Sequence, residues 1–272
     1  MAIDTSLFMA DIPAGTYAVG DKVTMTIKAG PQNVRSGRGA AKLKRVIVGL
    51  IGSVSGSVSN WKISVKNSDW IDPMISATCA LLEPTALDER TGTTQRGNDC
   101  ALTPNSSWEV EATCIAAGTT TVANSIFALI DVDYPSVAAI VDPDVLPGIP
   151  STIDVPISAT INGRALGTSA TAAWDIVNLD IFKAGFEYAL QKVEMYGISA
   201  MGFIALANAA GMGGLCRIMP IAPTTASIRN KIEYATKLVK GPMDVQFMLF
   251  ANSGTAITGN PSLLLDFVKR RM

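Results

Sequence analysis

The basic stretch KAGPQNVRSGRGAAKLKRV, residues 28–46, is the part of the sequence whose residue types come nearest to a phosphate-binding segment. It carries six positive charges and no negative ones, with glycines at positions 30, 37 and 39. A P-loop needs GxxxxGK[ST] and a dinucleotide fingerprint needs GxGxxG, and the stretch matches neither pattern. Clustered cations alone can hold nucleic acid, but no aromatic residue stands among them to stack on bases. We therefore expect a solvated or subunit-contacting loop, with candidate contacts at Arg35, Arg38, Lys42, Lys44 and Arg45.

Other residue types that support catalysis or metal binding are sparse. The chain has no histidine, which excludes Ser-His-Asp and Cys-His catalysis and the commonest metal ligand. Its four cysteines have no CxxC spacing, so a zinc site is not expected. Cys79 and Cys100 either form a bridge in an oxidising environment or are small core residues. The sequence predicts no enzyme, no cofactor, no metal site and no small-molecule substrate.

Four aspartates, at positions 131, 133, 142 and 144, form an acidic cluster near the middle of the chain. Calcium binds oxygen ligands at such densities, but the EF-hand spacing is absent. We therefore interpret the cluster as a solvated linker.

Composition indicates a folded protein with extensive protein contacts. Hydrophobic residues make up 48% and charged residues 17%, with a net charge of −1, so no global field attracts nucleic acid or an acidic membrane. The N-terminal segment has no basic region typical of a secretory signal, so we expect synthesis in a cytoplasm. The uncharged stretch 197–215 is long enough to span a bilayer, but its glycines favour buried strands or a short buried helix. Whether it contacts lipid stays open.

Four landmarks recur in the same order in the two halves of the sequence, which indicates an internal duplication. VTMTIKAG (23–30) matches VNLDIFKAG (177–185), and LKRV (43–46) matches LQKV (190–193). ATCIAAG (112–118) then matches ATKLVKG (235–241), and the aliphatic run 125–133 matches 244–252. The first copy is longer, and we expect its surplus to form two surface loops, 31–42 and 73–107.

The repeated segments favour strands. In DKVTMTIK and NWKISVKNS, apolar and polar residues alternate with period two. Four prolines within 133–152 predict a linker, giving domains 1–140 and 141–272. NPSLLLDFVKRRM (260–272) predicts a short C-terminal helix with Asn260 as cap and Pro261 at its first position. The fold class is thus all-β, with two tandem β-sandwiches and few short helices. Jelly rolls are favoured over immunoglobulin-like sandwiches, because no Cys-Trp-Cys signature appears.

Two tandem sandwiches in a chain of this length, with no histidine or catalytic motif, resemble double jelly-roll major capsid proteins of tailless icosahedral viruses, which often contain a membrane. The resemblance spans about residues 20–255 and implies a non-enzymatic structural protein of the virion, made in a host cytoplasm. It implies homotrimers within a larger shell, contacts with other virion proteins, and contacts of basic segments with an internal membrane or genome. Lys269, Arg270 and Arg271 are further candidates for contacts with phosphate, lipid head groups or a neighbouring subunit.

Two other classes of function remain open. One is a two-domain β-sandwich adhesin or filament subunit, which would bind a carbohydrate or polymerise by strand donation. The other is a hydrolase on a β scaffold, which the absence of histidine and of paired catalytic motifs disfavours.

Overall fold

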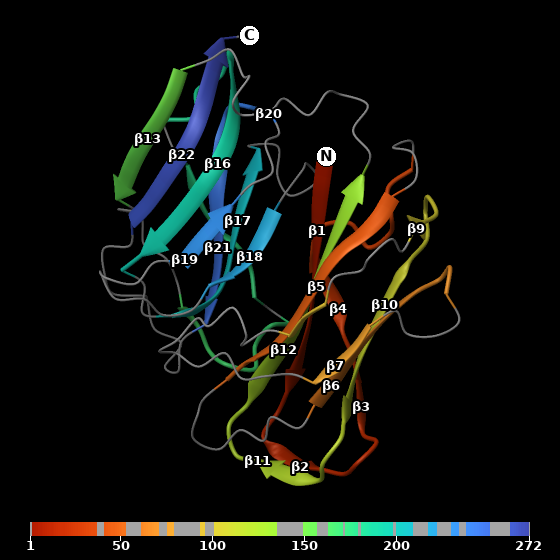
Figure 1. Ribbon diagram of the computed structural model, residues 1–272. Coiled ribbons are helices and arrows are strands. Elements are labelled where there is room, and N and C mark those ends of the chain that lie inside the picture. The colour runs from red at the N-terminus through yellow and green to blue at the C-terminus, as the bar shows by residue number, and fades with distance from the viewer. Residues whose placement is uncertain are drawn as a thin grey trace.

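In the described part of the chain all regular secondary structure is β-strand, and the strands form two sandwiches (Figure 1). The structure is a computed structural model. It describes residues 2–36, 41–52, 61–70, 75–78, 93–95, 101–134, 149–156, 163–170, 172–178, 181–197, 200–208, 217–221, 230–233, 238–250 and 262–271. The all-β class predicted from the sequence is confirmed.

Eight main strands build the first sandwich. In chain order they are β1 (Ala2–Ile12), β3 (Lys22–Thr24), β5 (Ala41–Ile51), β6 (Trp61–Asn67), β7 (Ile75–Thr78), β8 (Thr93–Gln95), β10 (Trp108–Cys114) and β12 (Asn124–Tyr134). One sheet has the order β1-β12-β5-β8 and the other β3-β10-β6-β7. The first strand therefore pairs with the eighth, the second with the seventh, the third with the sixth and the fourth with the fifth. This nested antiparallel pairing is that of a jelly roll.

Four short strands complete the first jelly roll. They are β2 (Gly15–Tyr17), β4 (Thr26–Ala29), β9 (Ala101–Leu102) and β11 (Gly118–Thr120). β4 covers the free edge of β1, β9 pairs with the start of β5, and β2 pairs with β11.

The second sandwich has the same strand order. Its eight main strands are β13 (Ile149–Pro156), β15 (Asp175–Asn178), β16 (Phe186–Tyr196), β17 (Met201–Asn208), β18 (Arg217–Ile221), β19 (Asn230–Glu233), β21 (Met243–Phe250) and β22 (Ser262–Arg271). One sheet has the order β13-β22-β16-β19, and in the other β15 pairs with β21 beside β17 and β18. β14 (Gly163–Arg164) and β20 (Leu238–Lys240) add to β21 and β16. The chain is therefore a double jelly roll by its own topology.

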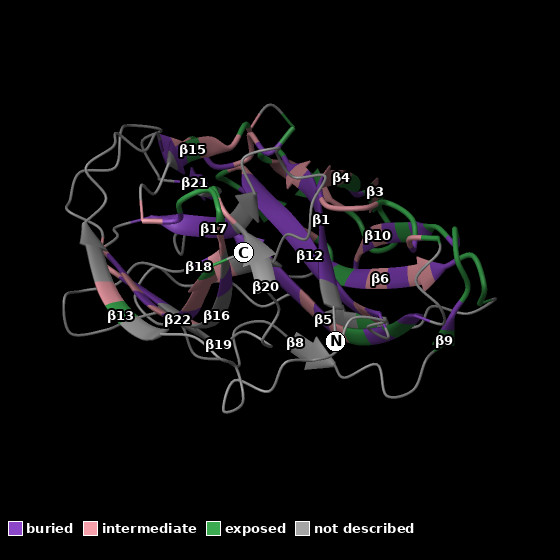
Figure 2. Ribbon diagram, turned by 90° about the horizontal axis from the view of Figure 1, so that it is seen from above, coloured by how far each residue is buried: buried purple, intermediate pink, exposed green. Residues whose placement is uncertain are grey.

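The four sheets stack as four layers (Figure 2). We call β3-β10-β6-β7 the first outer sheet and β4-β1-β12-β5-β8 the first inner sheet. The sheet that contains β21, β17 and β18 is the second inner sheet, and β13-β22-β16-β19 is the second outer sheet. The two inner sheets pack face to face, and the two outer sheets lie at opposite ends of the stack.

The contact between the inner sheets is apolar and closely packed. Leu7, Met9 and Phe127 of the first inner sheet belong to one buried cluster with Phe203 and Met248 of the second. The rings of Phe127 and Phe203 meet edge to face, with 5.0 Å between centroids. Burial of each large apolar side chain contributes about 1.5–3 kcal/mol. This contact therefore joins the two jelly rolls into one block.

Polar contacts fix the edge of this apolar interface. The carboxylate of Asp11 in β1 accepts hydrogen bonds from the backbone amides of Ser169 (2.8 Å) and Ala170 (3.0 Å) of the second jelly roll. Lys28 Nζ donates to the carbonyl oxygen of Ala170 at 2.8 Å. Gly167, with φ +72°, lies so close to Ala123 that a Cβ there would be 2.4 Å from the Ala123 Cβ. These contacts set the register between the two jelly rolls.

A β-bulge at the same place in both third strands matches the second sequence landmark. Lys44 in LKRV is the extra residue opposite β12, and Gln191 in LQKV is the extra residue opposite β22. The shared strand order and bulge are what an internal duplication requires. The last two landmarks, however, were matched one strand out of step: 125–133 lies in the eighth strand of its copy, whereas 244–252 begins in the seventh.

The C-terminal helix expected at 260–272 is wrong, because this segment contains the central strand β22. Leu263, Leu265 and Phe267 point into the core of the second jelly roll with period two. β13 and β16 flank β22 and supply hydrogen-bond partners on both sides. Sheet context therefore overrides local helix signals.

The first expected loop, 31–42, corresponds to the connection between β4 and β5. Residues 31–36 of this connection are described, and β5 begins at Ala41. The second, 73–107, is not one loop, because β7, β8 and β9 fall within it. The expected boundary near residue 140 and both Cys79 and Cys100 lie outside the described residues.

Two further features bear on assembly and membranes. β13 is an edge strand of the second outer sheet, with Pro150 opposite Val268 and Pro156 opposite Ser262.

The uncharged stretch 197–215 contributes β17, and nowhere in the described ranges is there a helix long and apolar enough to cross a bilayer.

Candidate functional site

The basic segment 28–46 begins at the end of β4 and runs into β5. Gly30 has φ +79°, and a Cβ there would clash with the carbonyl oxygen of Thr5. Only glycine allows this close approach of the segment to β1. Gly30 therefore has a structural role in the packing of this segment against β1.

Arg35, one of the predicted contact residues, is anchored inside the end of the first jelly roll. Its Nε lies 2.7 Å from a carboxylate oxygen of Asp4, and the Asp4 side chain is only 2% exposed. The backbone amide of Arg35 donates to the hydroxyl of Tyr134 at 2.9 Å. A buried carboxylate needs such a partner, because its desolvation is costly. Arg35 therefore has a structural partner within its own chain.

Arg45 is also paired within the chain. Its guanidinium contacts Asp131 through Nε at 2.9 Å and Nη2 at 2.7 Å, and the Thr5 hydroxyl donates to the other carboxylate oxygen at 2.7 Å. Asp131 is buried in β12, so the expectation that it belongs to a solvated linker is wrong. The sequence could not show this, because Arg45 and Thr5 are 86 and 126 residues away.

Lys42 and Lys44 are the exposed cations of the described part of this segment, and Arg38 lies outside the described residues. Both lysines lie near Asp133. Burial raises the pKa of the Asp133 carboxyl above its ordinary value, and the positive charges of Lys44, the N-terminal amine and Lys42 oppose this rise. This group mixes both signs of charge, which does not favour an anion site.

The basic C-terminus lies at the end of β22. The Lys269 amine sits over the Phe186 ring, 4.1 Å from its centroid. Arg270 is partly buried and Arg271 is exposed. Contacts of these three residues with phosphate, lipid or a neighbouring subunit stay predictions.

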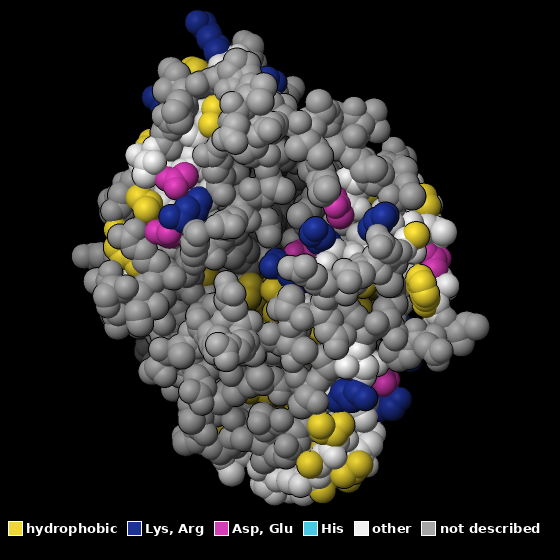
Figure 3. Space-filling view, viewed as in Figure 1, with side chains coloured by type: hydrophobic (Ala, Val, Ile, Leu, Met, Phe, Trp, Pro, Cys, Tyr) yellow, Lys and Arg dark blue, Asp and Glu magenta, His cyan; other side chains and the backbone are white. Residues whose placement is uncertain are grey.

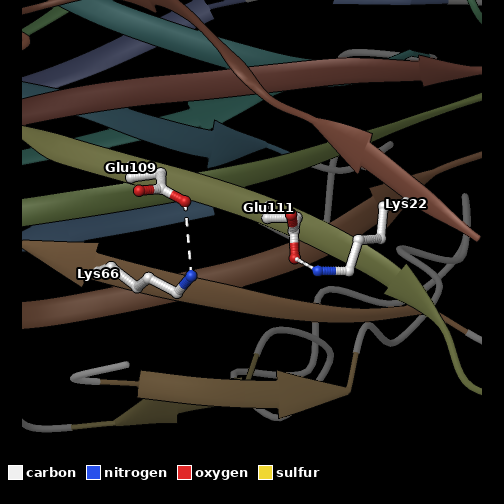
Figure 4. Close-up of polar contacts among 4 residues, drawn as sticks. All are labelled: Lys22, Lys66, Glu109 and Glu111. Carbon is white, nitrogen blue, oxygen red and sulfur yellow. Dashed lines mark hydrogen bonds and ion pairs between the residues drawn. The ribbon is translucent and has the colours of Figure 1, made fainter. Parts of the chain in front are cut away.

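The first outer sheet presents a polar face that sequence reasoning did not select as a site (Figure 4). Lys22 pairs with Glu111 at 2.9 Å, and Lys66 pairs with Glu109 at 3.4 Å. Lys62 lies further along β6 on the same face, opposite Thr113, and is exposed. The period-two alternation around these lysines was the signal that could have identified this face.

Charges on the surface mix both signs. In the view of Figure 3, Lys and Arg side chains lie beside Asp and Glu side chains, and no single-sign patch appears among the coloured residues. Among the described residues no group of three acidic or cysteine ligands could hold a metal, and Cys114 is buried with a free thiol.

No protein-family model matches the sequence, and no curated protein does. The chain is similar to the solved STIV MCP at 11% identity and a TM-score of 0.27, over 96% of each chain. It is similar to the major capsid protein P2 from bacteriophage PM2 at 6% identity and a TM-score of 0.26, over 98% of each chain. It is also similar to the infectious bursal disease virus VP2 subviral particle, at 10% identity and a TM-score of 0.23, over 99% of this chain and 76% of that chain. Because these TM-scores are below 0.5, the assignment of the double jelly-roll fold rests on the strand order of the chain itself.

Proposed function

We propose that this chain is the major capsid subunit of a virus, a non-enzymatic protein that assembles with copies of itself into an icosahedral shell. One observation carries the proposal: two jelly rolls of identical strand order are fused face to face into one block. The sequence resemblance to double jelly-roll capsid proteins agrees with this architecture. Synthesis in a host cytoplasm, residence in the virion and a trimeric building block are parts of the same proposal.

The apolar contact between the jelly rolls supports this role physically. A shell subunit must keep its shape while many copies associate, and a buried apolar interface gives that rigidity. Among the described strands, both outer sheets lie at the ends of the stack, which is the position that neighbouring subunits would contact (Figure 2).

Electron microscopy of the purified chain, combined with sedimentation velocity, tests the proposal. We expect discrete oligomers, trimers among them, and curved or closed lattices at high protein concentration. A protein that remains monomeric at every concentration and ionic strength contradicts the capsid role. Open-ended polymers joined by donated strands would instead support the adhesin or filament alternative.

A further inference from the structure

Two stretches without a charged residue meet at the end of the first jelly roll that lies away from both chain termini (Figure 1). They are PAGTYAVG (13–20), between β1 and β3, and IAAGTTTVA (115–123), between β10 and β12. Strands β2 and β11 within them pair with each other, and the amide of Gly20 donates to the carbonyl oxygen of Cys114 at 2.9 Å. We call these two stretches together the uncharged tip.

The uncharged tip exposes aliphatic side chains to solvent. Val19 is 66% exposed, Ile115 is 42% exposed and Val122 is 36% exposed. Further exposed apolar residues of the same stretches are Pro13, Ala14, Ala18, Ala116 and Ala117. In Figure 3, hydrophobic side chains gather at this end of the molecule. Single exposed aliphatic residues are common on protein surfaces, but a gathered set indicates an interaction site.

Internal contacts hold the uncharged tip in shape. The Tyr17 hydroxyl donates to the carbonyl oxygen of Pro13 at 2.6 Å, and the Tyr17 ring meets Trp61 of β6 edge to face, with 5.2 Å between centroids. Asp21 is the acidic residue that follows the first stretch, and its carboxylate accepts a hydrogen bond from the amide of Ala18 at 2.8 Å. The exposed aliphatic side chains are therefore presented on a preformed, projecting surface.

A row that contains two lysines lies directly behind the uncharged tip on the first outer sheet. Lys22, Thr113 and Lys62 lie side by side across β3, β10 and β6. Because a strand rises about 3.3 Å per residue, the row lies about 7 Å behind the backbone of Ile115. Lys22 is paired with Glu111, whereas Lys62 is exposed and has no ion pair within the described residues. The row therefore adds a positive charge that its own sheet does not neutralise.

A projecting uncharged surface with cations a short distance behind it fits a lipid bilayer better than a small ligand, which needs a concave site. Apolar side chains at a membrane surface enter about 5–10 Å into the boundary between head groups and acyl chains. Lysines at that distance reach the head groups, where anionic lipids attract them. The distance from the lysine row to Ile115 lies in this range.

We propose that the uncharged tip inserts Val19, Ile115 and Val122 into the surface of an anionic phospholipid bilayer, with Lys22 and Lys62 at the level of the head groups. This contact is made at the opposite end of the molecule from the basic C-terminus (Figure 1). It goes beyond the proposed shell role and does not depend on assembly.

Vesicle flotation with the full chain tests the insertion. We expect the wild type to bind vesicles of phosphatidylcholine and phosphatidylglycerol, and Val19→Asp and Ile115→Asp each to weaken this binding about tenfold, because a charge enters lipid at a cost. Ile176→Asp is the matched control, since Ile176 is an isoleucine that is 63% exposed on β15, outside the tip. It should bind as the wild type does. Circular dichroism spectra and melting temperatures near those of the wild type confirm that the variants fold.

Lys62→Gln tests the role of the lysine row. It should weaken binding to the anionic vesicles about fivefold and leave binding to vesicles of phosphatidylcholine alone unchanged. Inorganic phosphate should inhibit binding no more than sodium chloride of the same ionic strength does. Stronger inhibition by phosphate would assign the cations to a phosphate site and overturn the insertion.

Two further results would overturn the proposal. One is a wild type that binds no vesicle, or tip variants that bind as tightly as the wild type; the shell role is then judged separately, by assembly. The other is a loss of self-association in Ile115→Asp, measured by sedimentation velocity, with unchanged binding to vesicles. That result would show that the uncharged tip contacts protein.

Discussion

The inner and outer sheets of this chain are built from the same two kinds of sheet but differ in surface chemistry. Phe127 and Phe203 meet edge to face where the inner sheets pack. On the first outer sheet, Lys22–Glu111 and Lys66–Glu109 pairs occupy the exposed face. The difference separates an apolar contact that forms during folding from an exposed face whose charges pair within their own sheet.

The largest expected effect comes from removing a ring at the inner contact. Phe203→Ala leaves a cavity at a fully buried position and should lower the free energy of unfolding by about 3–5 kcal/mol. Lys66→Ala on the first outer sheet should change it by no more than about 0.5 kcal/mol. Urea denaturation of both variants checks the contrast. Equal losses would show that the outer sheet is as essential to folding as the inner contact.

The next effect compares the two aspartates in corresponding places. Arg45→Ala leaves Asp131 buried without its guanidinium and should cost roughly 2–4 kcal/mol of stability, given that the Arg45 side chain is 32% exposed. Lys192→Ala should cost less, about 1–2 kcal/mol, because the Lys192 amine contacts the buried Glu194 through one nitrogen, whereas the Arg45 guanidinium contacts Asp131 through two. Thermal unfolding of the two variants measures the difference. A large loss in Lys192→Ala would mean that the second jelly roll depends on this cation as the first does.

A pair of glycines isolates the close approach between the jelly rolls. Gly167 and Gly185 have similar positive φ values, +72° and +81°, but only Gly167 faces Ala123. Alanine at either position should cost about 1–2 kcal/mol for the backbone conformation. Gly167→Ala should cost a further 1–3 kcal/mol or so for overpacking. Differential scanning calorimetry would reveal the difference, and identical melting temperatures would contradict the close contact.

The smallest effect is a dependence on pH at the edge of the inner contact. Burial by itself raises the pKa of Asp11, but hydrogen bonds from Ser169, Ala170 and Ser125 outweigh it and lower the pKa below its usual 3.8. A lowered folded-state pKa stabilises the protein above about pH 3.8, and this stability is lost as the pH falls through the folded-state value. The stability difference between wild type and Asp11→Asn should therefore shrink on acidification.

Asp69 gives a control for this pH effect. Its pKa is also lowered, by hydrogen bonds from Thr103 that outweigh desolvation, but these contacts lie within the first jelly roll. Urea midpoints measured between pH 6 and pH 2.5 should show that the stabilisation contributed by each of the two carboxylates, Asp11 and Asp69, is lost on acidification. Protease cleavage between the jelly rolls should increase only with Asp11→Asn; an equal increase with Asp69→Asn would contradict the role of Asp11 as an interdomain clamp.

Local alternation made much of the fold predictable. The period-two pattern around Trp61 and Ile63 correctly gave β6, and the LKRV and LQKV landmarks correctly matched the third strands. The eighth strand of the second copy was missed because three consecutive leucines, at 263–265, conceal the alternation that places only the outer two in the core. A central strand is recognised by its neighbours, and these come from distant parts of the chain.

The candidate site was harder to predict for the same reason. The sequence shows a run of cations at 28–46, but their partners, Asp4 for Arg35 and Asp131 for Arg45, lie in β1 and β12. Spacing along the chain gives no sign of either pair. The polar face of the first outer sheet was implicit in the alternation, yet which lysine lacks a partner depends on cross-strand register.

The prolines of β13 affect how the edge of the second outer sheet can pair with another strand. Because proline has no N–H, the ladder to β22 must use the alternate residues, so Pro150 and Pro156 remove donors from the open edge. An incoming strand cannot extend the sheet there with a full set of hydrogen bonds. Fibre growth by strand pairing at this edge is thereby disfavoured.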